Sequence, residues 1–400
     1  MDGRALWQWA ERQQHQTIQH HDGAEDEPHL LPDASRVIWI VHKLSRAWPR
    51  LGRMCEKAPV RRKSRPEWVR FAGKMRKIMT LLLLLALLFS AFLLYSVMKI
   101  KGSPYMVFPP APRTKNMALY RHVEELSVKI GSRSVYEYDK LTAAKKYILS
   151  SLKGMGYTPI LQDFSCQERV FSNIIVTLPG KTHPEDVAVI GAHYDTVGGT
   201  PGADDNASAV AVLLEMCRLL KDYSPERTLK LVFFALEEPP IFRSESMGSF
   251  VYAREARNRQ EHISAMISLE MLGYYSDKEG GQSFPVPLMA LMYPSTPNFI
   301  TVVGNLSSRS LVNKVAVSLR KGGSIPVETL STVSFIPGVD FSDHLSFWKM
   351  DYPAVMITDT AFYRNPNYHA ETDRIDTLDF SRLSYLLDGL VQMAKDLSQR

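Results

Sequence analysis

The chain has 400 residues, of which 45% are hydrophobic and 22% charged. This composition excludes a wholly disordered chain, a collagen-like repeat and a disulfide-stabilised miniprotein, and the length suits one large domain or two smaller ones. The formal net charge is +6, but residues 1–77 hold 16 of the 48 Lys and Arg residues and only 9 of the 42 Asp and Glu residues. The positive excess therefore lies before residue 78, and we predict no nucleic-acid partner for the nearly neutral remainder.

An apolar segment divides the chain at residues 78–98, which contain neither a charge nor a proline. A helix of this length spans the hydrocarbon core of a bilayer, which is about 30 Å thick. We therefore predict an uncleaved transmembrane signal anchor that contacts the lipid bilayer. The alternatives are a buried core helix and a cleaved signal peptide starting at Met75 or Met79. The segment is longer than a usual signal-peptide core, and no clear small-x-small cleavage site follows it.

The charges on either side of this segment predict its orientation. Residues 61–77 carry eight Lys and Arg residues, whereas residues 99–118 carry four. By the positive-inside rule, residues 1–77 form a cytoplasmic, mostly disordered basic tail, and residues 99–400 lie outside the cytoplasm. We expect residues 99–115 to be a linker and residues 116–400 to be the main domain. Cys166 and Cys217 would then share the oxidising side, where they either pair or remain free buried thiols.

Strand and helix patterns alternate through the main domain. Helices are predicted over 137–153, 205–223, 246–257, 311–321 and 381–399, and strands over 172–178, 186–196, 228–236, 263–271, 298–305 and 352–359. This alternation predicts an α/β fold with a mixed, mostly parallel central sheet and helices on both of its faces. In such folds, ligands bind beyond the carboxyl ends of the strands.

Histidine and acidic residues follow several of the predicted strands at this edge. They are His193 and Asp195 after the strand from 186, Glu237 and Glu238 after that from 228, and Glu270 near the end of that from 263. Asp204 and Asp205 lie in a turn before a helix. Carboxylates gathered at one edge repel one another unless a cation is present, and imidazole and carboxylate groups are suitable ligands for Zn²⁺. The sequence therefore predicts a metal site.

Six motifs carry a resemblance to a known family. They are GAHYDTV (191–197), PGADDNASA (201–209), ALEE (235–238), SLEMLGY (268–274), SDH (342–344) and YHAETD (368–373). In this order and spacing they resemble the co-catalytic di-zinc aminopeptidases, a family that also includes glutamate carboxypeptidase and glutaminyl cyclase. The resemblance extends from about residue 134 to the C-terminus. It implies a zinc-aminopeptidase-like fold, two Zn²⁺ ions per chain and peptide substrates.

The resemblance also implies a role for each site residue. The metal ligands would be His193, Asp205, Glu238, Glu270 and His369. Asp205 would bridge both ions, with Glu238 joining His193 on one ion and His369 joining Glu270 on the other. Glu237 would be the general base, Asp195 would orient His193, and Tyr368 would stabilise the oxyanion. The implied reaction removes N-terminal residues from peptides by means of a metal-bridged hydroxide.

The chain departs from the family pattern in three places, so its substrate preference is left open. Glu270 stands where an aspartate is more usual, Ala209 replaces a glycine, and residues 237–246 (EEPPIFRSES) add prolines and length beside the site. The alternatives to an aminopeptidase are a single-zinc glutaminyl cyclase, a non-enzymatic binding ectodomain, and a carboxypeptidase that uses Arg243 or Arg364 to hold a carboxylate. His344 either shapes the substrate pocket or is structural.

Overall fold

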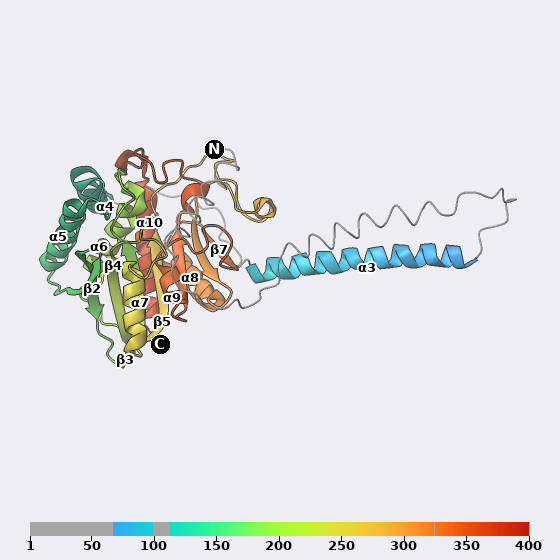
Figure 1. Cartoon of the computed structure of the whole chain (residues 1–400), viewed down its shortest axis with the longest axis horizontal. Coiled ribbons are helices and arrows are strands. Elements are labelled where there is room, and N and C mark those ends of the chain that lie inside the picture. The colour runs from blue at the N-terminus through green and yellow to red at the C-terminus, as the bar shows by residue number, and fades with distance from the viewer. Residues whose placement is uncertain (1–66, 99–112, 324, 400) are drawn as a thin grey trace. The chain divides into compact units, whose positions relative to one another are not determined.

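The computed structural model describes residues 67–98, 113–323 and 325–399 (Figure 1). Most of the predicted tail, residues 1–66, and most of the predicted linker, residues 99–112, lie outside these ranges. The first described element is helix α3 (Glu67–Met98), which contains the whole apolar segment. Among the described residues, none of the helices combines the length and the apolar character that crossing a membrane requires.

The other described residues form an α/β fold. Its strands are β1 (Ile160–Cys166), β2 (Arg169–Leu178), β3 (His183–His193), β4 (Arg227–Phe234), β5 (His262–Glu270), β6 (Ile300–Asn305), β7 (Val327–Thr332) and β8 (Ala354–Thr358). Its helices are α4 (Arg113–Val123), α5 (Tyr138–Gly154), α6 (Ala209–Leu219), α7 (Gly248–Asn258), α8 (Arg309–Gly322), α9 (His344–Trp348) and α10 (Phe380–Leu397). Short helical segments are η1 (Glu124–Ile130), η2 (Ala203–Ser208), η3 (Pro287–Leu291), η4 (Ala361–Tyr363) and η5 (Ile375–Thr377).

The strands form one sheet in the order β1-β2-β4-β3-β5-β8-β6-β7. Strands β4, β3, β5 and β8 run parallel to one another, and β6 is parallel to β7. The β1–β2, β2–β4 and β6–β8 pairs are antiparallel. This arrangement confirms the predicted mixed, mostly parallel sheet. The two strands that the sequence did not predict, β1 and β7, lie at its two edges.

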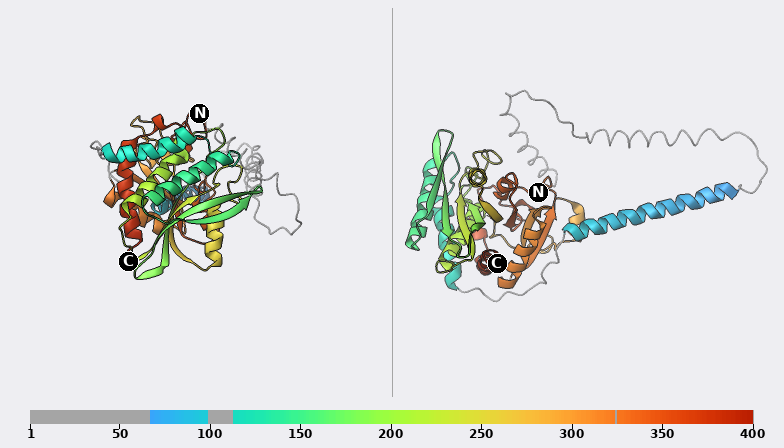
Figure 2. Two further views of the ribbon diagram at one scale, coloured as in Figure 1. Left: turned by 90° about the vertical axis from the view of Figure 1, so that its left-hand side faces the viewer. Right: turned by 90° about the horizontal axis from the view of Figure 1, so that it is seen from below.

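Helices cover both faces of the sheet, as predicted (Figure 2). Helices α7 and α9 pack together on one face, and α4, α5, α6, α8 and α10 cover the other. Alternate residues of β3 supply the two cores: Ala188, Ile190 and Ala192 face the larger helical layer, and Val187 and Val189 face α7 and α9. Because side chains alternate along a strand, the next residues on the α7–α9 face are Gly191 and then His193.

Both described cysteines are free and buried, one at the end of β1 and the other in α6. Of the two alternatives for Cys166 and Cys217, the structure therefore has the free thiols. The helix predicted from residue 205 begins later, at Ala209. Segment η2 precedes it, and Asp205 there has non-helical backbone angles (φ −105°, ψ 87°).

Candidate metal centre

All five predicted metal ligands meet at the carboxyl edge of the sheet. His193 Nε2 lies 3.4 Å from Asp205 Oδ1 and 3.3 Å from Glu270 Oε2. His369 Nε2 lies 3.2 Å from Asp205 Oδ2 and 3.2 Å from Glu238 Oε2. Two three-residue groups among these side chains share Asp205, which presents one carboxylate oxygen to each, and a third group joins His193 to Glu237 and Glu238.

The predicted division of the ligands between two ions stays a prediction, because His193 lies within ligand distance of both Glu270 and Glu238. His193 forms one group with Asp205 and Glu270 and another with Glu237 and Glu238, whereas His369 is grouped with Asp205 and Glu238. Sheet register explains the first grouping. Gly191 of β3 pairs with Ser268 of β5 in parallel register. Two residues further along each strand, His193 and Glu270 therefore stand side by side on the same face.

The polar atoms of the site fit a pair of cations. His193 Nδ1 and Nε2, Asp205 Oδ1 and Glu238 Oε1 are buried and have no hydrogen-bond partner among the described residues. Leaving such atoms unpaired is costly, so their number in one place indicates a missing partner. Imidazole nitrogens together with carboxylate oxygens suit Zn²⁺, and a bridging carboxylate is typical of two-metal sites.

Asp195 holds the backbone at the end of β4 as well as facing His193. Its Oδ1 accepts a hydrogen bond from the Glu237 amide at 3.0 Å, and its Oδ2 accepts one from the Glu238 amide at 3.1 Å. His193 Nδ1 is further away, 3.5 Å from Asp195 Oδ1. Asp195 therefore fixes the chain that carries the predicted base and one metal ligand, in addition to the predicted orientation of the imidazole.

The carboxylates and imidazoles of the site perturb one another strongly. Burial raises the pKa of Glu238 to about 7, and the Asp205 carboxylate raises it against the opposing effect of His369. Burial also raises the pKa of Glu237 well above its usual range, where His193 opposes the shift and Glu270 adds to it. Burial alone would lower the pKa of His369, but Glu238 and Asp205 raise it to about 10. A bound divalent cation would take the place of these protons.

Two features hold the turn that carries Asp205. Asp373 accepts hydrogen bonds from the amides of Asp204 at 2.9 Å and Asp205 at 3.0 Å. Gly202 has a left-handed backbone (φ +60°), and a Cβ at that position would lie 2.3 Å from Thr196 Cγ2 and 2.4 Å from the Asp205 carbonyl oxygen. The sequence therefore requires glycine here to bring the bridging carboxylate into place.

Three further polar residues of this turn support Glu270, and the sequence analysis gave none of them that role. Asp204, Asn206 and Ser208 accept hydrogen bonds from the amides of Gly273, Met271 and Leu272 at 2.8, 3.0 and 3.0 Å, respectively. These amides directly follow Glu270 at the end of β5. The sequence did contain a signal for this role. In the motif DDNAS, every second residue (204, 206 and 208) is polar.

The sequence analysis also missed Arg133, a fully buried cation close to this acidic site. Its guanidinium donates hydrogen bonds to the carbonyl oxygens of Tyr194 (2.8 Å), Pro201 (2.8 Å) and Gly202 (3.0 Å). Burial lowers the pKa of Arg133 to about 10, against the attraction of Asp195 and Asp373. It remains protonated at neutral pH and ties the loop after β3 to the turn before Asp205.

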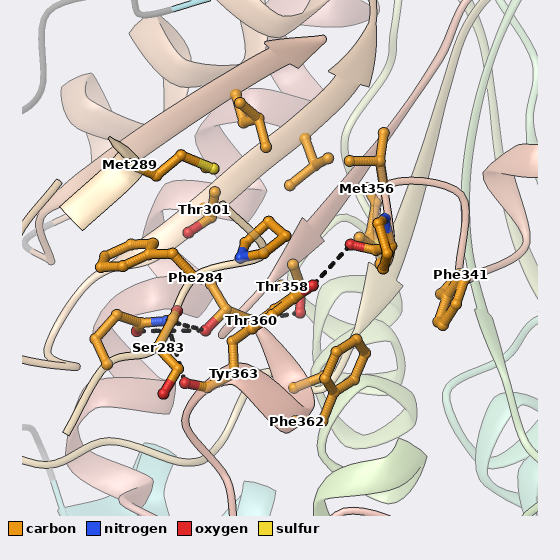
Figure 3. Close-up of a pocket in the computed structure, with 18 of the residues that line it drawn as sticks. Ser283, Phe284, Met289, Thr301, Phe341, Met356, Thr358, Thr360, Phe362 and Tyr363 are labelled. Carbon is orange, nitrogen blue, oxygen red and sulfur yellow. Dashed lines mark hydrogen bonds between the residues drawn. The ribbon is translucent and has the colours of Figure 1, made fainter. Parts of the chain in front are cut away.

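Tyr368 lies where the prediction requires it, although its catalytic role stays a prediction. Its ring stacks on His369 with 3.7 Å between centroids and 18° between planes. Together with Glu270, it lines a pocket with an empty volume of about 760 Å³ (Figure 3). The other lining residues are largely apolar and include Phe284, Met289 and Met356. The arrangement places an apolar pocket directly beside the metal ligands.

The two arginines considered for a substrate carboxylate have other partners. Arg243 forms an ion pair with Asp340 at 2.7 Å. Arg364 is buried and donates to the Phe299 carbonyl oxygen at 2.8 Å and to Gln282 Oε1 at 3.0 Å. Neither arginine lines the pocket. Arg364 instead holds Gln282, which does.

Comparisons with known proteins identify the family. The model of peptidase family M28 matches residues 173–393, and the chain belongs to that family. The Escherichia coli protein YfbL is 38% identical over 294 residues, which are 71% of this chain and 90% of that protein. A probable aminopeptidase of Saccharomyces cerevisiae is 24% identical over 57% of each chain. The solved glutaminyl cyclase of Bacteroides thetaiotaomicron shares the fold, with a TM-score of 0.53 and 18% identity over 71% of this chain and 99% of that one.

The metal content of five variants tests the grouping of ligands around Asp205. His193→Asn with Glu270→Gln removes two ligands of one group and should leave about half of the wild-type metal. His193→Asn with His369→Asn removes one ligand from each group and should leave almost none. Elemental analysis of the two double variants, with each single histidine variant for reference, measures this. If His193→Asn with Glu238→Gln retained half of the wild-type metal, and His193→Asn with Glu270→Gln did not, the predicted grouping would be correct.

His344 is structural, and its burial predicts an acid-dependent loss of stability. Its side chain is fully buried, with Nε2 2.8 Å from the Val339 carbonyl oxygen, and burial lowers its pKa to about 4. Above pH 6.5 both folded and unfolded forms are neutral. As the pH falls from 6.5 to 4, only the unfolded form gains a proton, so up to about 3 kcal/mol of stability is lost.

Denaturant unfolding at pH 7.5 and pH 4.5 measures this loss for the wild type and for His344→Gln. The variant lacks the titrating group and should lose less stability between the two pH values. His262→Gln, at a largely exposed histidine, is the matched control and should behave as the wild type does. Equal losses for the wild type and His344→Gln would contradict the assignment.

Proposed function

We propose that the chain is a zinc-dependent aminopeptidase that hydrolyses the N-terminal residue from peptides. The observation that carries this proposal is the pair of ligand groups sharing Asp205, with Glu237 beside them and an apolar pocket at Glu270. Family membership supports a peptidase, and the yeast relative's description as a probable aminopeptidase supports this direction of cleavage.

The two ligand groups would hold two Zn²⁺ ions, which when bound polarise the substrate carbonyl and lower the pKa of water. Glu237 is 6% exposed, and its amide is fixed by Asp195. Its carboxylate takes a proton from the attacking water and returns it to the leaving amine. Tyr368, which stacks on His369 and lines the pocket, would donate a hydrogen bond from its hydroxyl to the developing oxyanion.

The charges around the pocket favour a free substrate amine over a free carboxylate. Among the described residues that line the pocket, none is basic, and Glu270 contributes a carboxylate. A cationic amine would be attracted by the carboxylates at this edge, whereas a substrate carboxylate would find no basic partner there. This arrangement favours an aminopeptidase over a carboxypeptidase.

The fold itself does not separate a peptidase from a glutaminyl cyclase, because a solved cyclase shares it. The ligand set supports the peptidase, because five candidate ligands are more than one ion requires. About two zinc ions per chain would therefore support the peptidase, and one ion would favour the cyclase.

Purified full-length protein tests the reaction and the role of Glu237. It should hydrolyse aminoacyl amides that have a free amine, leave N-acetylated amides intact, and lose activity with a chelator. Glu237→Gln should lower kcat by about 10²- to 10⁴-fold because it removes the base, while its zinc content stays that of the wild type. Glu279→Gln, at an exposed site away from the pocket, is the control. Full turnover by Glu237→Gln, or cleavage of blocked substrates alone, would refute the proposal.

We also propose that residues 78–98 anchor the enzyme in a membrane, with residues 1–77 in the cytoplasm and the peptidase domain outside it. The support is the uncharged sequence and the positive flank at 61–77. Along α3, Leu88 and Phe89 are each 66% exposed, and contiguous exposed apolar side chains are typical of surfaces that contact a membrane or another protein. The side chains of 91–98 lie outside the described residues.

Carbonate extraction of membranes from cells that express the full chain tests the anchor. The wild type should remain in the pellet, and Leu87→Arg should be partly released, because an arginine at the centre of a spanning helix costs about 3 kcal/mol. Phe71→Arg, before the apolar segment, should remain in the pellet. A C-terminal reporter should be active only outside the cytoplasm. Release of the wild type, or a reporter active only in the cytoplasm, would disprove the anchor.

A further inference from the structure

A row of aromatic side chains borders the metal centre. This aromatic row consists of Tyr368, Phe362, Phe341 and Phe242, and neighbouring ring centroids lie 5.3, 6.0 and 6.0 Å apart in that order. The row begins beside His369, on which Tyr368 stacks, and it ends at Phe242, which follows Glu238 by four residues. It therefore joins the chain segments that carry two of the candidate metal ligands.

The outer end of the row lies in residues 237–246, where the chain departs from the family pattern. The amide of Phe242 donates a hydrogen bond to the Glu238 carbonyl oxygen at 3.2 Å, so this segment turns back and holds the ring close to the metal centre. The guanidinium carbon of Arg243 lies 5.4 Å from the ring centroids of both Phe242 and Phe341, and its Nη2 forms an ion pair with Asp340. These contacts hold the two rings together.

The aromatic row extends beyond the pocket. Phe341, Phe362 and Tyr368 line the pocket, and Figure 3 shows the first two of them there. Phe242 is outside the set of described residues that line it. Phe242 and Phe341 are both half-buried, so part of each ring is accessible to a ligand. Accessible rings beside a reaction centre are suitable contacts for another aromatic ring.

The proposed mechanism indicates which part of a substrate meets these rings. Glu237 returns a proton to the leaving amine, which is the backbone nitrogen of the substrate's second residue. That residue therefore begins within hydrogen-bond reach of Glu237. Because the segment that carries Phe242 follows Glu237 and turns back on Glu238, its ring lies on the side where the second residue leaves the metal centre.

We propose that Phe242 and Phe341 bind the side chain of the substrate's second residue and make the enzyme prefer an aromatic side chain at that position. An aromatic second residue packs against the two half-buried rings, whose arrangement Arg243 maintains. A small second residue makes none of these ring contacts. The inference rests on the proposed aminopeptidase activity and names the substrate class of that site.

Steady-state kinetics of the full-length protein on alanyl-phenylalanine amide and alanyl-alanine amide test the inference, with release of the N-terminal alanine as the readout. Both substrates present the same N-terminal residue, so the ratio of their kcat/KM values reports on the second residue. The wild type should favour phenylalanine at the second position by about two- to tenfold, the usual contribution of one aromatic pair. Because both values come from one enzyme sample, the ratio does not depend on the fraction that is folded.

Substitutions of Phe242 assign the preference to the row. Phe242→Ala removes the outer ring and should bring the ratio close to one, and Phe242→Leu, which keeps an apolar side chain, should also lower it. Phe242→Tyr keeps a ring and should preserve the ratio. Phe335→Ala makes the alanine change at a phenylalanine that is 84% exposed and outside the row, and its ratio should match the wild type.

A second ratio distinguishes the second residue from the N-terminal residue. The kcat/KM values for phenylalanine amide and alanine amide differ only through the N-terminal side chain. Their ratio should be the same in Phe242→Ala as in the wild type, because Phe242 lies outside the pocket. A change in this ratio, with the dipeptide ratio unchanged, would place Phe242 at the N-terminal side chain and overturn the inference.

The remaining outcomes separate this inference from the function on which it rests. An active wild type that hydrolyses the two dipeptide amides equally well overturns the inference while the aminopeptidase stands. The wild-type dipeptide ratio in Phe242→Ala, or in Phe242→Leu where the alanine variant is inactive, does the same. Failure of the wild type to hydrolyse any free-amine amide overturns the proposed function, and the inference falls with it.

Discussion

The sharing of Asp205 between two histidines is the interaction on which the site depends. Each carboxylate oxygen of Asp205 faces one imidazole, and each imidazole faces one further carboxylate. Four acidic side chains are consequently buried within a small space, three of them as metal ligands and one as the proposed base. Burial and mutual repulsion oppose their ionisation, so the arrangement is stable at neutral pH only with protons or cations among them. Divalent cations bound to these side chains would satisfy this need and would leave Glu237 free to accept a proton.

The fold holds the acidic side chains in place through hydrogen bonds to the backbone of the segments that carry them. Asp195 and Asp373 each accept two adjacent amides, and these amides belong to Glu237 and Glu238 in one case and to Asp204 and Asp205 in the other. Burial raises the pKa of Asp373 to about 7, against the opposing effect of its two amide hydrogen bonds. Arg133 adds a buried positive charge that offsets the negative charge of the site. Its guanidinium donates hydrogen bonds to backbone carbonyl oxygens, so it leaves the carboxylates of the candidate ligands unoccupied.

The sequence predicted which side chains meet at the edge of the sheet better than it predicted all of their neighbours there. His193, Glu238 and Glu270 could be recognised because each stands where an apolar strand ends. Their neighbours in space depend on strand order, and β3 lies between β4 and β5 in the sheet. No local pattern reports which strand lies beside which, so the placement of Glu270 beside His193 was not accessible. The edge strands β1 and β7 were missed for a related reason, because β1 is half exposed and lacks a continuous apolar run. Arg133 was missed because an isolated arginine gives no sign of burial.

The SDH motif connects the pocket to the metal centre, which explains why these residues are adjacent in the chain. Ser342 donates a hydrogen bond to Glu270 Oε2 at 2.7 Å, and it also bonds Ser268 of β5 at 2.7 Å. Two residues later, His344 bonds the carbonyl oxygen of Val339, which lines the pocket. The wall of the pocket and a metal ligand are therefore fixed by one short segment.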